Sequence, residues 1–178
     1  MALRTRVPVV LLCLLVAGCG MPRISIPFFG DEKPSATVPK VPRERSVDPA
    51  RAIALINEHR SKRGRPPLKH DPKLSRIARE TAQELARRNQ LRTEMHTKDG
   101  LARRLDAAQY GAGRAAENLG AGYPTLVMAV DGWKKSRGHN RNLLNGDMTH
   151  AGIGLALTQQ GPYQSFWVLL LAKPDQPA

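Results

Sequence analysis

The chain has 178 residues, of which 41% are apolar, enough for one domain with its own hydrophobic core. Its 28 Lys and Arg against 15 Asp and Glu give a formal net charge of +13, which attracts anionic surfaces at long range. Two cysteines are too few for a scaffold held by many disulfides, so the core itself must hold the fold.

The N-terminus has the features of a bacterial lipoprotein signal. Arg4 and Arg6 precede an apolar run, residues 7–16, that is too short to span a bilayer as a stable helix. Small residues then lead into Cys19 and resemble a lipobox. We therefore predict that residues 1–18 are a signal peptide and that Cys19 carries a lipid. An ordinary secretory signal cut elsewhere and an uncleaved anchor are the alternatives.

Removal of the signal defines the mature chain. Cys13 would be lost and Cys19 lipidated, which leaves the domain without a disulfide, and the net charge falls to +11 because two arginines go with residues 1–18. Acidic phospholipid, lipopolysaccharide or another envelope polyanion is the expected anionic partner, since nucleic acid is rarely met at a cell envelope. Simple solvation of charged helix faces is the competing interpretation.

Residues 19–45 predict a lipidated cysteine and a Pro-rich tether. Prolines recur among charged residues, a composition that favours extended conformations and buries too little apolar surface to fold. Four apolar residues interrupt it, and they are expected either to enter the lipid interface or to dock on the domain: Ile24, Ile26, Phe28 and Phe29.

The next segments have helical signals. Asp48-Pro49 and Asp71-Pro72 each place an N-cap before a proline at the first helical position. A third helix is predicted over residues 100–109, and a fourth from Pro124 to a stop at Gly138.

The last third of the chain changes to a strand pattern. Residues 151–157 and 164–171 predict two strands, and the second is apolar at nearly every position, so both of its faces should be covered. A short strand over residues 115–119 is expected to join them. Helices around a buried sheet predict an α+β fold class, a three-layer α-β-α sandwich with a central, mainly antiparallel sheet.

Five segments occur in a characteristic order: residues 55–60, 67–74, 133–144, 151–154 and 166–168. This ordered set resembles the CAP superfamily of cysteine-rich secretory proteins, antigen 5 and pathogenesis-related proteins, and its bacterial SCP-like branch in particular. The resemblance covers residues 48–172 and implies a CAP domain over residues 46–175, with an α-β-α sandwich and a central cleft. In the family, two histidines and two acidic residues line that cleft.

Three of the four cleft positions match when they are carried over residue by residue: His96, Glu117 and His139. The second acid, expected shortly after Trp133, has no counterpart, and Ser136 is predicted to occupy its space. The incomplete set argues against a catalytic or strong metal-binding role.

Several chemistries are compatible with these side chains. Two imidazoles and a carboxylate can hold zinc with a position open for water, which would make a metal-assisted hydrolase. Alternatively, the three side chains hydrogen-bond to one another and to loops, and hold the cleft together. A triad of Ser136, His139 and Glu117 is disfavoured because Gly138 predicts a break within it and no nucleophile-elbow motif is present.

The other histidines, His59, His70 and His150, are expected to have structural roles, and Trp133 and Trp167 to anchor the core. We therefore predict an envelope-anchored lipoprotein that binds a lipid, an envelope polyanion or a protein, with a hydrolase or a pure scaffold as alternatives. Binding of sterols or fatty acids in apolar grooves by other family members supports the lipid option. Gly20 after Cys19 favours the outer membrane in a Gram-negative host, and the outer face of the cell membrane is expected in a Gram-positive one.

Overall fold

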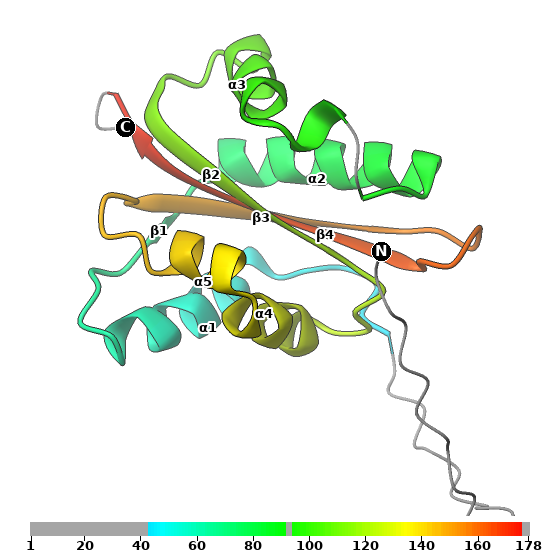
Figure 1. Cartoon of the computed structure of the whole chain (residues 1–178), viewed down its shortest axis with the longest axis horizontal. Helices are drawn as coiled ribbons and strands as arrows, with labels where there is room; N and C mark the ends of the chain where they lie inside the picture. The colour runs from blue at the N-terminus through cyan, green and yellow to red at the C-terminus, as the bar shows by residue number, and fades with distance from the viewer. Residues whose placement is uncertain (1–42, 92–93, 176–178) are drawn as a thin grey trace, which may run out of the picture. The chain divides into compact units, whose positions relative to one another are not determined.

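The computed structural model describes residues 43–91 and 94–175 (Figure 1). The predicted signal peptide, the lipidation at Cys19 and residues 19–42 of the tether lie outside the described residues. In chain order the elements are α1 (Pro49–Ser61), β1 (Lys69–His70), α2 (Pro72–Arg88), the 3₁₀ turn η1 (Glu94–His96), α3 (Lys98–Ala107), β2 (Ala112–Ala121), α4 (Leu126–Lys135), α5 (Arg137–Leu143), β3 (His150–Leu157) and β4 (Ser165–Pro174). None of the described helices is long and apolar enough to cross a bilayer.

The sheet has four strands in the order β1-β3-β4-β2. Strand β4 pairs antiparallel with both β3 and β2, and the two-residue β1 runs parallel to β3. Alternate side chains of β4 belong to different cores: Trp167 and Leu169 to one, Phe166 and Val168 to the other. The prediction that this strand is covered on both faces is confirmed.

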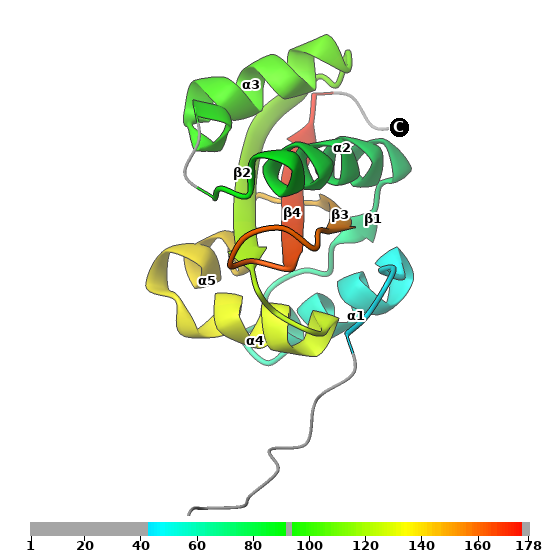
Figure 2. The same ribbon diagram turned by 90° about the vertical axis from the view of Figure 1, so that its right-hand side faces the viewer.

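Helices form a layer on each face of the sheet. Helices α2 and α3 lie over one face, and α1, α4 and α5 lie over the other (Figures 1 and 2). Each layer closes its own cluster of buried apolar side chains against the sheet. The predicted three-layer α-β-α sandwich with a mainly antiparallel sheet is therefore confirmed.

Two predicted helix starts are present as expected. The Asp48 carboxylate accepts from Ala50 N, and the Asp71 carboxylate accepts from Lys73 N and Leu74 N, which satisfies free N–H groups at the starts of α1 and α2. Thr97 caps α3 by accepting from Gly100 N, so this helix begins two residues before the predicted start.

Glycines in β3 let α2 lie directly on the sheet. A Cβ placed on Gly152 would overlap the backbone of Leu74 and Ser75, and one on Gly154 would overlap the backbone of Ala78 and Arg79. Strand and helix backbones therefore touch here, which fixes the position of α2 and of the side chains that α2 carries toward β2.

The predicted stop at Gly138 is wrong. Helix α4 ends at Lys135, Ser136 has an extended backbone (φ −83°, ψ 120°), and Gly138 lies inside the following helix α5. The break therefore occurs two residues earlier and a new helix starts at once. The strand predicted over residues 115–119 is also longer, and β1 was not anticipated because a two-residue strand has no periodicity to detect.

Candidate functional site

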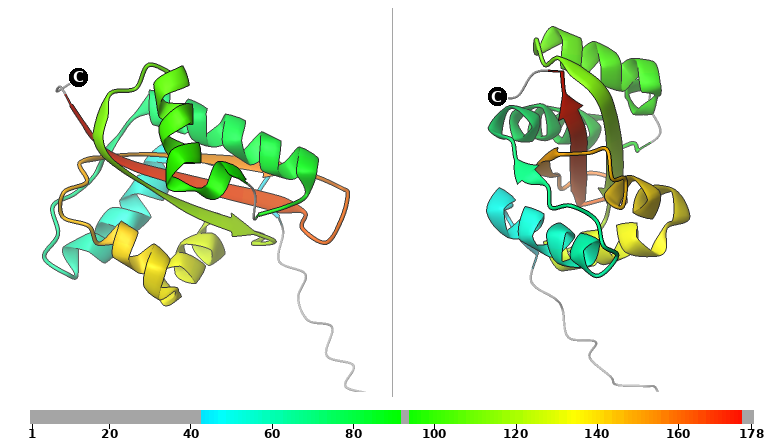
Figure 3. Two further views of the ribbon diagram at one scale, coloured as in Figure 1. Left: turned by 45° about the horizontal axis from the view of Figure 1, so that its top comes forward. Right: turned by 90° about the vertical axis from the view of Figure 1, so that its left-hand side faces the viewer.

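The site is built around Glu117 on the edge strand β2. Helix α5 lies on one side of this strand, and η1 and α3 lie on the other (Figures 2 and 3). The Glu117 side chain is only 5% exposed, so its charge needs partners within the protein.

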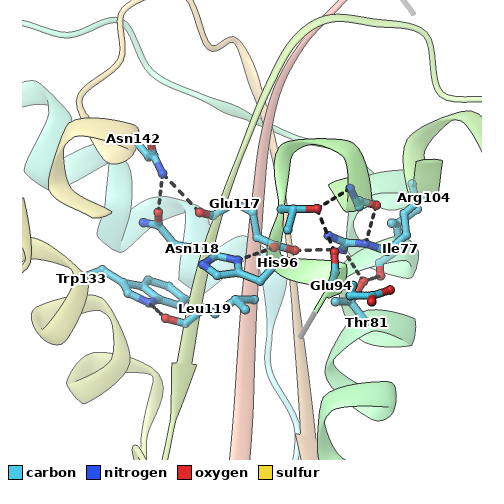
Figure 4. A network of polar contacts seen from close by, with 12 residues as sticks. Ile77, Thr81, Glu94, His96, Arg104, Glu117, Asn118, Leu119, Trp133 and Asn142 are labelled. Carbon is cyan, nitrogen blue, oxygen red and sulfur yellow. Dashed lines mark hydrogen bonds and ion pairs between the residues drawn. The ribbon is translucent and has the colours of Figure 1, made fainter. Parts of the chain in front are cut away.

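Each oxygen of the Glu117 carboxylate has a partner. His96 Nδ1 lies 2.9 Å from Oε2, and Arg104 Nη1 lies 2.9 Å from Oε1 (Figure 4). Arg104 is itself held by its bond to Thr81 Oγ1 (2.7 Å) on α2. Side chains from η1, α2, α3 and β2 thus meet at one buried carboxylate.

The contact with Glu117 orients the His96 ring. A carboxylate accepts hydrogen bonds, so Nδ1 of His96 carries the proton in this contact. In the neutral ring, Nε2 is then an acceptor. The His96 side chain is 40% exposed, so the site presents a fixed imidazole at the protein surface.

His139 lies on α5 and is half-buried. Burial and the nearby His96 imidazole, when charged, both lower the pKa of His139, which keeps this ring neutral near pH 7. Its backbone carbonyl accepts from Asn118 Nδ2 (3.1 Å). Asn142 Nδ2 in turn donates to Asn118 Oδ1 (2.9 Å) and to Glu117 O (3.2 Å), and these bonds tie α5 to β2.

The Ser136 side chain makes no hydrogen bond to this network in the described residues. Ser136 is the N-cap residue of α5, yet its side chain makes no capping hydrogen bond. The Glu117 carboxylate contacts His96 and not His139. In the part of the chain that the structure describes, Ser136, His139 and Glu117 therefore do not form a hydrogen-bonded triad.

The three predicted metal ligands also do not converge. Within residues 43–91 and 94–175, no group of three or more His, Cys, Asp or Glu side chains could hold a metal ion. Both Glu117 oxygens and Nδ1 of His96 are already engaged. As placed, the residues do not fit zinc, and zinc binding stays a prediction that needs another arrangement.

A small hollow opens beside the buried carboxylate. Its volume is about 240 Å³. It is lined by His96, Thr97, Lys98, Leu101, Ala115, Ala116, Glu117 and Asn142. His96 and Glu117 border the hollow directly, whereas His139 is not among its lining residues and joins the network through the bond from Asn118 to its carbonyl.

The sequence did not reveal Arg104 or Thr81 as members of the site. Arg104 is one of many arginines in the chain, and its role depends on a contact between α3 and β2 that no local pattern encodes. Arg60 was also missed: it is fully buried and donates to the carbonyls of Pro66, Leu143, Asn145 and Met148.

The other histidines lie outside the network around Glu117. His59 Nε2 lies 2.8 Å from Asn140 Oδ1, which links α1 to α5. His70 lies exposed in β1, with Nε2 2.9 Å from Ser75 Oγ. His150 begins β3 and borders a hollow of about 750 Å³ near the start of α2, away from Glu117. Trp133 and Trp167 are fully buried, as predicted.

Residues 53–171 match the model of the cysteine-rich secretory protein (CAP) family. The chain belongs to this family. A curated relative is the uncharacterized protein YkwD of Bacillus subtilis, 30% identical over 118 residues, which make up 66% of this chain and 46% of the relative. The chain therefore spans less than half of that relative's length.

Solved structures share the CAP fold. One is an extracellular protein with an SCP domain from Bacillus anthracis, with a TM-score of 0.59 and 26% identity over 70% of this chain and 40% of that one. Another is an outer surface protein of Borrelia burgdorferi, with a TM-score of 0.62 and 24% identity over 73% of this chain and 98% of that one. The second likeness concerns the fold alone.

Proposed function

We propose that this chain is an envelope-anchored CAP protein whose cleft at His96, Glu117 and His139 binds a ligand and does not carry out a reaction. The observation that carries the proposal is the arrangement around Glu117. One carboxylate oxygen is engaged by His96 and the other by Arg104. A carboxylate held in this way orients its partners and would have to give one up before it took a proton from a substrate.

An extracytoplasmic location is supported by the predicted lipobox and by a structural neighbour. The Bacillus anthracis neighbour is an extracellular protein. In the proposal, Cys19 carries the lipid and residues 20–45 tether the domain to the membrane. Mass spectrometry of the mature N-terminus tests this part, since an unmodified terminus elsewhere would contradict it.

The ligand is proposed to be anionic. Lys98 beside the hollow and Arg137 and Arg141 on α5 are exposed, and in the described residues none of them has a carboxylate within ion-pair distance. Cations that have no internal partner attract an anionic ligand and raise its rate of association. Envelope lipids, polyanions and acidic proteins all offer such groups.

The test is co-sedimentation of the full-length chain with purified peptidoglycan sacculi and with phosphatidylglycerol vesicles, with Cys19→Ala present throughout so that no lipid anchor can insert into the vesicles. A His96→Ala/His139→Ala variant should lose most of the binding, and His150→Ala, a histidine away from the cleft, is the matched control. Equal binding by the double variant would contradict a role for the cleft. Binding of vesicles that survives in the double variant would instead point to a lipid groove elsewhere.

A hydrolase is the second candidate, favoured by the contact between His96 and Glu117. A carboxylate that holds an imidazole by Nδ1 leaves Nε2 free to take a proton, as a general base does. The metal-assisted form of this reaction further requires stoichiometric zinc and turnover that a chelator abolishes. If the purified full-length protein has neither stoichiometric zinc nor chelator-sensitive turnover, the metal-assisted hydrolase is contradicted and the binding role stands.

A further inference from the structure

One side of the backbone of strand β2 faces away from the sheet. The register with β4 and the bond from Gly122 N to Ser165 O (2.9 Å) place the even-numbered residues from 116 to 122 on the β4 side. Successive residues of a strand alternate, so Ala115, Glu117 and Leu119 direct their N–H and C=O groups outward.

Side chains already use two of these outward carbonyls. Asn142 donates to Glu117 O (3.2 Å), and Trp133 Nε1 donates to Leu119 O (2.9 Å), as Figure 4 shows. In the described part of the chain, no hydrogen bond accounts for the outward groups of Ala115 or for Glu117 N–H. An edge with free donors and acceptors is a template on which another strand can pair.

Two adjoining hollows run along this edge under α3. The hollow beside Glu117 has a volume of about 240 Å³, and a second of about 280 Å³ extends to Ala112. Lys98, Leu101 and Ala115 line both of them. The groove therefore follows the strand from Ala112 to Glu117, a length of roughly 20 Å for six extended residues.

Lys98 lies where the two hollows meet, and it is exposed and has no ion-pair partner in the residues described here. The other cation of the lining, Arg114, pairs with Asp147. The chain as a whole carries a formal net charge of +13, which favours an anionic ligand. Asp106 is the one carboxylate of the lining that has neither an arginine nor a histidine within ion-pair distance.

We propose that the cleft takes an extended acidic polypeptide segment, which lies alongside β2 and pairs with the outward N–H and C=O of Ala115 and with the N–H of Glu117. This inference rests on the proposed binding role of the cleft and names its ligand class. Main-chain hydrogen bonds would supply affinity, Leu101 would contact the apolar side chains of the segment, and Lys98 would contact its acidic ones. The described strand β2 thus becomes an inner strand of a five-stranded sheet.

The test uses the full-length protein and a defined probe, an acetylated and amidated heptapeptide in which Glu and Val alternate. Its matched control is the same peptide with alternate backbone nitrogens methylated, which blocks strand pairing and keeps every side chain. We expect fluorescence anisotropy to show binding of the first peptide and at least about tenfold weaker binding of the second, since several main-chain bonds are lost. Equal binding of both peptides would overturn strand addition.

A substitution at Ala115 tests the same main-chain hydrogen bonds by changing the protein in place of the peptide. Ala115→Pro removes one outward N–H and leaves the bonds to β4 intact, and His150→Ala, which lines neither of the two hollows, is the control. We expect weaker peptide binding by the proline variant and unchanged binding by His150→Ala. If the proline variant does not fold, strand pairing is tested by comparing the methylated and unmethylated peptides on the wild-type protein.

Failure of this inference can be told from failure of the proposed function. No binding of the acidic peptide, together with His96- and His139-dependent binding of sacculi, would overturn the peptide ligand in favour of a glycan and keep the cleft as the binding site. No binding of peptide, sacculi or vesicles would overturn both.

Discussion

Arg104 Nη1 lies 2.9 Å from Glu117 Oε1, on the carboxylate oxygen that His96 does not contact. The Arg104 side chain is 16% exposed and that of Glu117 5%, so the ion pair is shielded from water. This pair gives a nearly buried carboxylate an ion partner on one oxygen, while the other oxygen orients the His96 ring.

Substitution of Arg104 should therefore destabilise the domain strongly. Arg104→Met leaves Glu117 buried beside a histidine alone, and we expect a loss of about 3 kcal/mol in the free energy of unfolding. Urea unfolding measures it. Arg103→Met, an exposed neighbour, should change stability by no more than about 0.5 kcal/mol. A double variant with Glu117→Gln should recover part of the loss, and a fully additive double variant would contradict the pairing.

The lowered pKa of His139 predicts a pH dependence of stability. Its ordinary pKa in the unfolded chain is about 6.5, so at lower pH the unfolded chain binds a proton more readily than the folded one. The contribution of His139 to the free energy of unfolding is therefore fully present above pH 6.5 and is lost as the pH falls below that value.

The measurement is thermal unfolding at pH 7.5 and pH 5.5. The melting temperature of His139→Gln should fall less on acidification than that of the wild type, whereas His150→Gln should behave like the wild type. A wild type and a His139→Gln variant with the same pH dependence would show that His139 does not titrate differently on folding.

Arg60 should be essential for the loops around α1. Its guanidinium is fully buried and bonded to four backbone carbonyls, among them Leu143 O at 2.7 Å. Arg60→Met leaves these acceptors without a donor, and we expect a cost of about 3 kcal/mol by urea unfolding. Arg63→Met, on the exposed turn that follows, is the matched control and should be nearly neutral.

Two glycines should respond to alanine in opposite directions. Gly152→Ala places a Cβ against the backbone of α2, and we expect a loss of about 3 kcal/mol. Gly138→Ala meets nothing within 4 Å inside α5 and should stabilise the protein by about 0.5 kcal/mol or more. Calorimetric melting of the two variants checks the signs, and a stable Gly152→Ala protein would contradict the close approach of α2 to β3.

Local signals in the sequence predicted most of the fold. Asp48-Pro49 and Asp71-Pro72 indicated correct helix starts because a cap and a proline act within one turn, and the apolar run of β4 indicated two buried faces. Gly138 misled because glycine marks a helix end only where the backbone needs positive φ, and Gly138 does not have it.

The candidate site was predictable only in part. The resemblance to CAP proteins named His96, Glu117 and His139, and the structure brings the first two into contact. Arg104 reaches Glu117 from α3 and is held by Thr81 of α2, so the role of both depends on packing between α2, α3 and β2. Such contacts between distant segments leave no spacing or periodicity in the chain that could be recognised.

The role of the cleft is tested most directly by imidazole NMR of the full-length chain carrying Cys19→Ala, which removes the lipid anchor, titrated in turn with peptidoglycan fragments, phosphatidylglycerol vesicles, the acidic heptapeptide and zinc. We predict that one of the anionic ligands shifts the signals of His96 and His139 and leaves His150 unchanged, and that zinc does not bind stoichiometrically. Zinc held at one equivalent by both imidazoles, or a ligand that binds without shifting either signal, would contradict the proposal that the cleft is a metal-free binding site.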